Sequence, residues 1–232
     1  MTISFYISRL IGSLIITFFT ATISAQTPSF RWEKGISGTR KFDSKWALNL
    51  QILERTRFNE YNSENLSTRS DRMEIRGFLT YSLFNQRKMS LGYMYRSLDP
   101  FDSERGFEHR ITQQFAFISK LKALRITNRI RLEERIFENE FELRLRYQFS
   151  NDFPIQGESL DVGELYLVLG NELVLSLNKT GEELENRFIT GIGKLMKNSQ
   201  KIQIALVSRN SDFISSEKKH ILQLETNYFF IW

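Results

Sequence analysis

Residues 126–149 read ITNRIRLEERIFENEFELRLRYQF, and apolar and charged side chains alternate through most of this stretch. Ile130 and Leu132 share one parity, whereas Arg129 and Arg131 share the other. On a helix these charges would point in all directions and leave no apolar face to bury. On a β-strand, successive side chains point to opposite faces, so the pattern separates into an apolar face and a charged face. The stretch therefore predicts two long β-strands joined by a tight turn.

The same alternation recurs from Trp46 to Trp232 and predicts ten strands in all. The eight further runs are marked by apolar positions that include Leu48, Ile75, Leu91, Phe115, Leu167, Ile192, Ile204 and Leu224. Short turns are expected at 85–88, 119–122 and 197–200, and longer loops at 59–70, 98–106, 178–183 and 210–219. A tight loop at 138–139 and a long segment at 151–162 depart from this alternation of short and long connections. Residues 30–42 could supply more strand, so twelve strands is the alternative count.

Several features favour a membrane barrel over a soluble β-sandwich or a lipocalin-like barrel, which alternate in the same way. The strands approach the 9–11 residues that a tilted span needs, and aromatic residues gather near their ends. A mean hydropathy of -0.34 is too polar for a helical membrane protein. After the first segment no run approaches 18 consecutive apolar residues. The sequence therefore predicts an all-β, antiparallel up-and-down transmembrane β-barrel.

Residues 1–25 have the features of a secretory signal peptide. Arg9 precedes the apolar run 10–19, which is too short to span a membrane as a helix, and small residues lead to Ala25. An uncleaved anchor is the alternative. We expect export of residues 26–232 to the outer membrane, with outer-membrane lipid and the barrel assembly machinery as partners. The last strand ends on alternating aromatic residues that we interpret as the assembly signal: Tyr228, Phe230 and Trp232.

The inward parity carries arginine and glutamate, whereas lysines lie mainly in turns and at strand ends. Arginine suits a crowded interior because its guanidinium stays charged and binds carboxylates with two hydrogen bonds. The predicted lumen network comprises Glu108, Arg110, Arg129, Arg131, Glu133, Arg135, Glu140, Glu142, Arg144, Arg146, Glu172 and Arg187. The same parity continues through Arg55, Arg57, Arg72, Glu74, Arg76, Arg96, Arg125, Glu164, Arg209 and Glu225. The network predicts a mostly filled lumen and a structural or interaction role.

Two other functions stay open. Arginine outnumbers glutamate on the inward parity, and unpaired buried charge is costly, so a narrow anion-preferring channel or an anionic-ligand barrel is the first alternative. A rim-site hydrolase is the second, because His109, His220 and the loop residues Asp99, Asp102 and Asp212 fall toward one end of the barrel. Both histidines lie at positions whose side chains point outward, away from the lumen. This favours a structural role at the rim of the barrel, in the girdle or as a capping residue, over a catalytic one.

Other function classes lack support in the sequence. The chain contains no cysteine and none of the GxGxxG, P-loop, HExxH or GxSxG motifs. We therefore expect no cofactor and no metal site. The formal net charge is +5, but the basic residues alternate with acidic ones along the chain and do not cluster. Nucleic acid is therefore not an expected partner.

A set of short motifs, in order along the chain, resembles the outer-membrane barrels grouped as domain of unknown function 2490. They are Glu108-His109-Arg110 with Gln113-Gln114, Arg129 to Arg135, Arg144 to Tyr147, Asn171-Glu172, Asn186-Arg187 with Gly191 and Gly193, and His220. The resemblance implies an outer-membrane barrel and brings no activity with it. It also implies that the Arg and Glu positions belong to a shared framework. Residues 30–42 match least.

Overall fold

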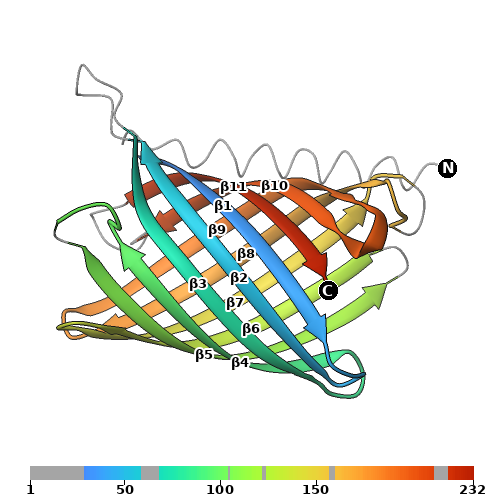
Figure 1. The fold of residues 1–232 in the computed structure, drawn as a ribbon, viewed down its shortest axis with the longest axis horizontal. Helices are drawn as coiled ribbons and strands as arrows, with labels where there is room; N and C mark the ends of the chain where they lie inside the picture. The colour runs from blue at the N-terminus through green and yellow to red at the C-terminus, as the bar shows by residue number, and fades with distance from the viewer. Residues whose placement is uncertain (1–28, 59–67, 104, 122–123, 157–159, 212–218) are drawn as a thin grey trace.

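The computed structural model describes residues 29–58, 68–103, 105–121, 124–156, 160–211 and 219–232, and these form one closed β-barrel (Figure 1). The predicted signal peptide, residues 1–25, lies outside the described residues. The strands are β1 (Ser29–Lys41), β2 (Trp46–Phe58), β3 (Thr68–Ser82), β4 (Arg87–Leu98), β5 (Gly106–Leu121), β6 (Leu124–Phe137), β7 (Phe141–Pro154), β8 (Leu165–Asn178), β9 (Gly181–Leu195), β10 (Lys201–Ser211) and β11 (Lys219–Ile231).

Helical structure is limited to η1 (Lys197–Ser199), a 3-10 turn between β9 and β10, within the described part of the chain. Among these residues no helix has the length and apolar character needed to cross a membrane.

Eleven strands close the barrel, one more than the ten predicted and one fewer than the twelve-strand alternative. The additional strand is β1, which falls in the region 30–42 where extra strand was considered possible. Consecutive strands pair antiparallel, and β1 closes the barrel by pairing parallel to β11, from Ser29↔Ile221 to Thr39↔Ile231. Figure 1 shows β1 in blue beside β11 in red. The parallel pair follows from the odd count, since up-and-down strands one and eleven run in the same direction.

The odd count also places the start of β1 and the end of β11 at opposite ends of the barrel. We name these the N-terminal end, where Ser29 lies, and the C-terminal end, where Ile231 lies. In the turn that joins β1 to β2 at the C-terminal end, Asp43 accepts hydrogen bonds from the backbone N–H groups of Trp46 and Lys45, both at 2.6 Å. These bonds lower the pKa of the Asp43 carboxyl below its ordinary value.

Two connections differ from the sequence prediction. The predicted long loop at 178–183 is a two-residue turn, because Asn178 pairs directly with Gly181. Gly181 has a φ of 141°, a conformation that a residue with a Cβ rarely adopts. The long segment predicted at 151–162 begins later, because β7 continues to Pro154.

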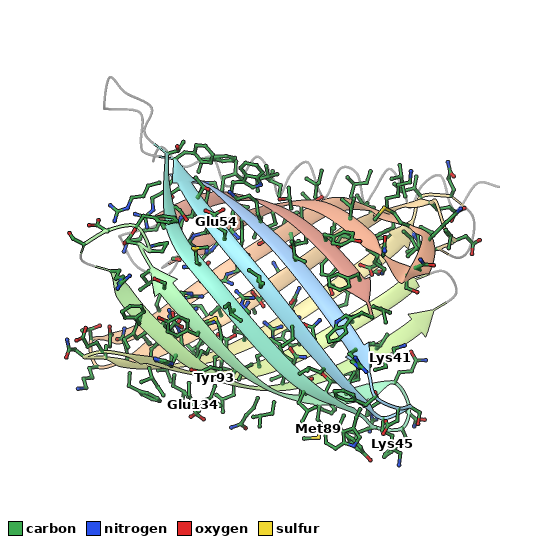
Figure 2. All side chains as sticks on the ribbon, in the orientation of Figure 1. Lys41, Lys45, Glu54, Met89, Tyr93 and Glu134 are labelled. Atoms are coloured by element: carbon green, nitrogen blue, oxygen red, sulfur yellow. The ribbon has the colours of Figure 1, made fainter. Side chains whose placement is uncertain are left out.

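The two faces of the sheet differ in polarity as the alternation predicted. Ile36, Ile52 and Ile75 on the outer surface are 56%, 60% and 59% exposed, whereas the lumen side chains of Glu108 and Glu133 are almost fully buried. Figure 2 shows Met89, Tyr93 and Glu134 projecting away from the barrel wall. Aromatic pairs lie near both ends of the outer surface: Tyr95–Phe107 toward the N-terminal end and Trp46–Tyr81 toward the C-terminal end. The barrel thus has an apolar exterior and a polar interior.

Candidate functional site

A continuous network of ion pairs runs through the lumen from β3 to β10. Its six carboxylates come from six different strands and are linked in series by arginines that each contact two of them. The carboxylates are Glu74, Glu108, Glu133, Glu142, Glu172 and Glu185. The bridging arginines are Arg96, Arg110, Arg135, Arg146 and Arg187. Arg72, Arg76, Arg144 and Arg209 each add a contact to one of these carboxylates.

Glu108 on β5 lies at the centre of the first half of the network and is 0% exposed. Arg110 Nη2 donates to its Oε1 at 2.6 Å, and Arg135 Nε donates to the same oxygen at 2.8 Å. Arg96 donates to Oε2, where Arg135 Nη2 also donates at 3.0 Å. Hydrogen bonds between charged groups are about twice as strong as neutral ones, and a carboxylate can accept several. Glu108 therefore fixes arginines from three neighbouring strands.

Glu172 on β8 holds arginines in the same way in the second half of the network, between β7 and β10. Arg146 on β7 donates to both of its oxygens, with the Nη2–Oε2 distance at 2.6 Å, and Arg187 on β9 contacts Oε2 at 3.2 Å. Arg187 in turn contacts Glu185, which Arg209 on β10 also contacts at 2.6 Å. Glu133, contacted by both Arg110 and Arg146, joins the two halves. Each link joins neighbouring strands, so the network forms a continuous band along the lumen wall from β3 to β10.

A separate cluster lies near the N-terminal end. Asp71 on β3 accepts two hydrogen bonds from Arg55, at 2.7 and 2.6 Å, and its Oδ2 also contacts Arg57 at 3.1 Å. Asp71 is 2% exposed, so the two arginines neutralise a buried carboxylate. The pairing of β2 with β3 shifts register between Arg55 and Thr56. This β-bulge turns Asp71 into the lumen although the parity of β3 predicts that it points outward.

Most of the predicted network residues meet as expected. Those that take part in ion pairs are Glu108, Arg110, Arg129, Glu133, Arg135, Glu142, Arg144, Arg146, Glu172 and Arg187. Arg131 has no carboxylate within 4.0 Å among the described residues; its Nε donates to Gln114 Oε1 at 2.7 Å. Glu140 is exposed in the turn before β7, outside the network, and Glu164 lies in the connection before β8. Both residues lie just outside their strands, where the alternation of inward and outward side chains no longer applies.

Several lumen acids were not predicted. Glu185 and Asp71 are both ion-paired and buried, and Glu33 on β1 lies opposite Glu225 on β11 in the parallel pair. The alternation Glu183, Glu185, Arg187 along β9 could have identified Glu185. No sequence signal could have identified Asp71, because a bulge reverses the parity.

Burial of the lumen side chains changes along the barrel axis. In the half toward the N-terminal end, Glu74, Arg96 and Arg110 are 2%, 3% and 5% exposed. Near mid-depth, where the network ends, the side chains of Arg129 and Arg76 are 28% and 22% exposed. Beyond them, the half toward the C-terminal end is lined largely by small or neutral polar residues, which include Ser37, Asn49, Gln51, Thr80, Ser90, Thr127, Gln148 and Ser150. The two halves of the lumen therefore differ in charge, with the ion pairs concentrated toward the N-terminal end.

The histidines lie on the outer surface, as their parity predicted. His109 Nδ1 is 2.7 Å from the hydroxyl of Tyr93, and His220 Nε2 is 3.0 Å from the hydroxyl of Ser208. Asp99 and Asp102 instead contact Arg69, and Asp212 lies outside the described residues. In the described part of the chain, neither histidine contacts a carboxylate.

The three predicted assembly-signal residues lie on the outer face at the end of β11. The rings of Tyr228 and Phe230 stack at 5.8 Å, and Trp232 is 52% exposed. The backbone N–H of Trp232 donates to the carbonyl of Thr39 at 3.0 Å and so ties the chain end to β1. Their role as an assembly signal stays a prediction.

The described residues bring together no group of three histidine, cysteine, aspartate or glutamate side chains that could hold a metal ion. Among known protein families, the model described as "Protein of unknown function (DUF2490)" matches residues 34–219. No curated protein and no solved structure matches the chain.

Proposed function

The chain belongs to the DUF2490 family, whose function is unknown, and we propose that it is an outer-membrane β-barrel with a lumen closed by the Arg/Glu network. In this proposal the barrel has a structural or interaction role and does not conduct ions. The apolar outer surface supports the membrane part of the proposal, and the ion-pair network supports the closed lumen.

The observation that carries the proposal is the apolar outer surface to which all eleven strands contribute. One exposed apolar residue from each of β1 to β10, in chain order, is Ile36, Ile52, Ile75, Leu91, Ile111, Ile130, Leu145, Leu167, Ile192 and Ile204, and Trp232 follows on the outer face at the end of β11. Soluble monomers rarely expose a continuous apolar patch larger than a few hundred Å². This surface supports placement of the barrel in a surrounding apolar phase, where a closed barrel would leave no strand edge unpaired.

The lengths of the connections and one polar patch support an orientation for the barrel. Most connections at the C-terminal end are short turns, and outer-membrane barrels have short turns on the periplasmic side, so we assign the C-terminal end of this barrel to the periplasm. Lys34 and Glu54 form an ion pair on the outer surface in the half toward the N-terminal end, beside Thr56 and Ser70. Charged groups are costly in the hydrocarbon core and favourable at headgroup level. We therefore assign this patch to the headgroups of the outer leaflet.

The burial of the network supports the closed lumen. Eleven strands enclose a wider interior than the eight-stranded barrels whose interiors side chains fill, so long arginine and glutamate side chains are needed to occupy it. Arginines from β4, β5 and β6 converge on Glu108, which is fully buried. Hydrogen bonds to both Glu108 oxygens hold these arginines in place, so an ion moving along the axis would have to break several charge-assisted bonds.

Single-channel recording in planar bilayers tests the closed lumen. The full chain should insert without giving steady conductance steps, and Glu142→Gln should stay silent as well, because Glu142 is only one member of the network. Reproducible anion-selective steps from the unmodified protein, shifted in selectivity by Glu142→Gln, would instead identify a narrow channel.

A further inference from the structure

Arg129 and Arg131 are neighbouring lumen arginines on β6 that the ion-pair network leaves without a close carboxylate. Among the residues that the structure describes, Arg129 has one carboxylate oxygen within 4.0 Å, Glu172 Oε1 at 4.0 Å, and Arg146 already donates to that oxygen at 2.8 Å. Arg131 has no carboxylate within 4.0 Å among the described residues, and the Nε of Arg129 is buried with no hydrogen-bond partner. Two positive charges therefore face the lumen with almost no compensation.

Two glutamines hold these arginines and leave donors of their own free. Arg131 Nε donates to Gln114 Oε1 at 2.7 Å, and Arg129 donates to Gln148 Oε1. Because each glutamine uses its oxygen to accept, its amide N–H groups point elsewhere. Gln114 Nε2 makes only a long contact of 3.4 Å to Ser90, and Gln148 Nε2 donates to none of the described residues. The site thus combines two guanidinium groups with two amide donors.

The site lies near mid-depth, on the side of the network that faces the C-terminal end. The ring of Phe78 lies flat over Gly92 on the neighbouring strand, and the Arg131 guanidinium lies 5.6 Å from the centre of that ring. Tyr166 covers Gly193 in the same way, so both aromatic rings stay against the wall. At the C-terminal end itself, a cavity of about 270 Å³ is lined by residues that include Thr39, Asp152, Tyr166, Lys201 and Gln203. This cavity lies on the same side of the network as Arg129 and Arg131.

We propose that Arg129 and Arg131, with Gln114 and Gln148, bind a phosphate group that enters from the C-terminal end. A dianionic phosphate matches the two uncompensated guanidinium charges and offers enough oxygen atoms for both arginines and both amides. The positive charges of Arg129, Arg131 and Arg146 repel one another, and the bound anion offsets that repulsion. The network beyond Glu172 and Glu133 blocks passage to the other end, so the site binds but does not conduct.

This inference rests on the closed lumen of the proposed function, and phosphate binding tests it separately. The full chain in detergent, in phosphate-free buffer, is titrated with inorganic phosphate in a calorimeter; a second titration uses a short-chain phosphatidic acid. The test variant is the double substitution R129Q/R131Q. The matched control is Arg57→Gln, which removes a lumen arginine near the N-terminal end while Arg55 still pairs with Asp71.

The unmodified protein and Arg57→Gln should bind the phosphate group with similar affinity. R129Q/R131Q should bind at least about a hundredfold more weakly, since each charged hydrogen-bond donor contributes about tenfold or more. Binding of phosphatidic acid but not of inorganic phosphate would support the same site with a lipid headgroup as its source. Absence of binding to either probe, or equal loss in Arg57→Gln, would overturn the inference. Neither result would affect the closed lumen, which fails only if the bilayer recordings show conductance.

Stability without ligand distinguishes a binding role from a structural one. In phosphate-free buffer Arg131→Gln should leave the urea midpoint of unfolding unchanged or raised, because the arginine has no carboxylate partner and is repelled by its neighbours. Arg146→Gln should lower that midpoint, because Arg146 bridges Glu133 and Glu172. An equal loss in both variants would assign Arg131 to the structural network and contradict the proposal.

Discussion

Glu108→Gln removes one charge from the middle of the network and leaves the shape of the side chain nearly unchanged. The carboxylate accepts five hydrogen bonds from Arg96, Arg110 and Arg135. A glutamine amide keeps one accepting oxygen, but its NH2 group replaces the other oxygen and faces guanidinium donors. Some of the arginine N–H groups therefore lose their hydrogen-bond acceptor. Breaking a buried ion pair by removing one partner costs about 3–5 kcal/mol. With three arginines sharing this carboxylate, the loss should lie at the upper end of that range.

The assay is urea unfolding of the refolded barrel in lipid vesicles, followed by the gel shift between folded and unfolded forms. Glu140→Gln is the matched control, because Glu140 is exposed in the turn before β7. The control should change the free energy of unfolding by no more than about 0.5 kcal/mol, as surface substitutions usually do. If Glu108→Gln and Glu140→Gln differ by less than about 1 kcal/mol, the network does not stabilise the barrel as described.

Three further perturbations test the outer surface, the chain end and the strand packing. Leu145→Arg should lower the free energy of unfolding in vesicles by about 2–4 kcal/mol, whereas Phe141→Arg, equally exposed at 48% but at the strand end, should cost about 0–1 kcal/mol; equal costs would contradict the membrane depth assigned here. Deleting Trp232 should reduce the yield of assembled barrel in cells, and an unchanged yield would argue against an assembly signal. Gly191→Ala should cost about 1–3 kcal/mol, because its Cβ would lie 2.6 Å from the carbonyl oxygen of Ile204; a neutral result would show that β9 and β10 can separate there.

The period of two was sufficient to predict the closed barrel and the two faces of most strands. The charges of β5, β6 and β7 were assigned to the lumen from parity alone, and ten of the twelve predicted network residues take part in ion pairs there. This worked because burying one face fixes the register, and a slip of one residue would turn every charge toward the apolar side.

The strand count could not be predicted in the same way. The segment that forms β1 places Lys34 on the outer face and has glycine at 35 and 38, so its alternation is weak. Gly35 instead fits against Asn227 of β11, a neighbour that only the closed barrel reveals. The alternation of inward and outward residues also carries no information on strand direction. The parallel pairing of β1 with β11 therefore could not be predicted from it.

The errors within the site have local causes. Glu140 follows the parity of Glu142 but lies before the first residue of β7, where the alternation no longer applies. Asp71 enters the lumen through the β-bulge opposite Arg55. The lack of a carboxylate for Arg131 depends on which side chains meet across the lumen, and strand periodicity does not determine that. Candidate ion pairs could therefore be predicted, but the uncompensated arginines could not.

The most direct test of the account is where the protein is found in the cell and how it migrates on a gel. Purified outer membranes are solubilised in detergent, and samples are run with and without boiling. The account predicts that the protein is recovered in this fraction and that the unboiled form migrates faster, as a folded barrel does. Recovery as a soluble periplasmic protein without detergent would contradict the account, because the exposed apolar surface of all eleven strands would then have no membrane to cover it.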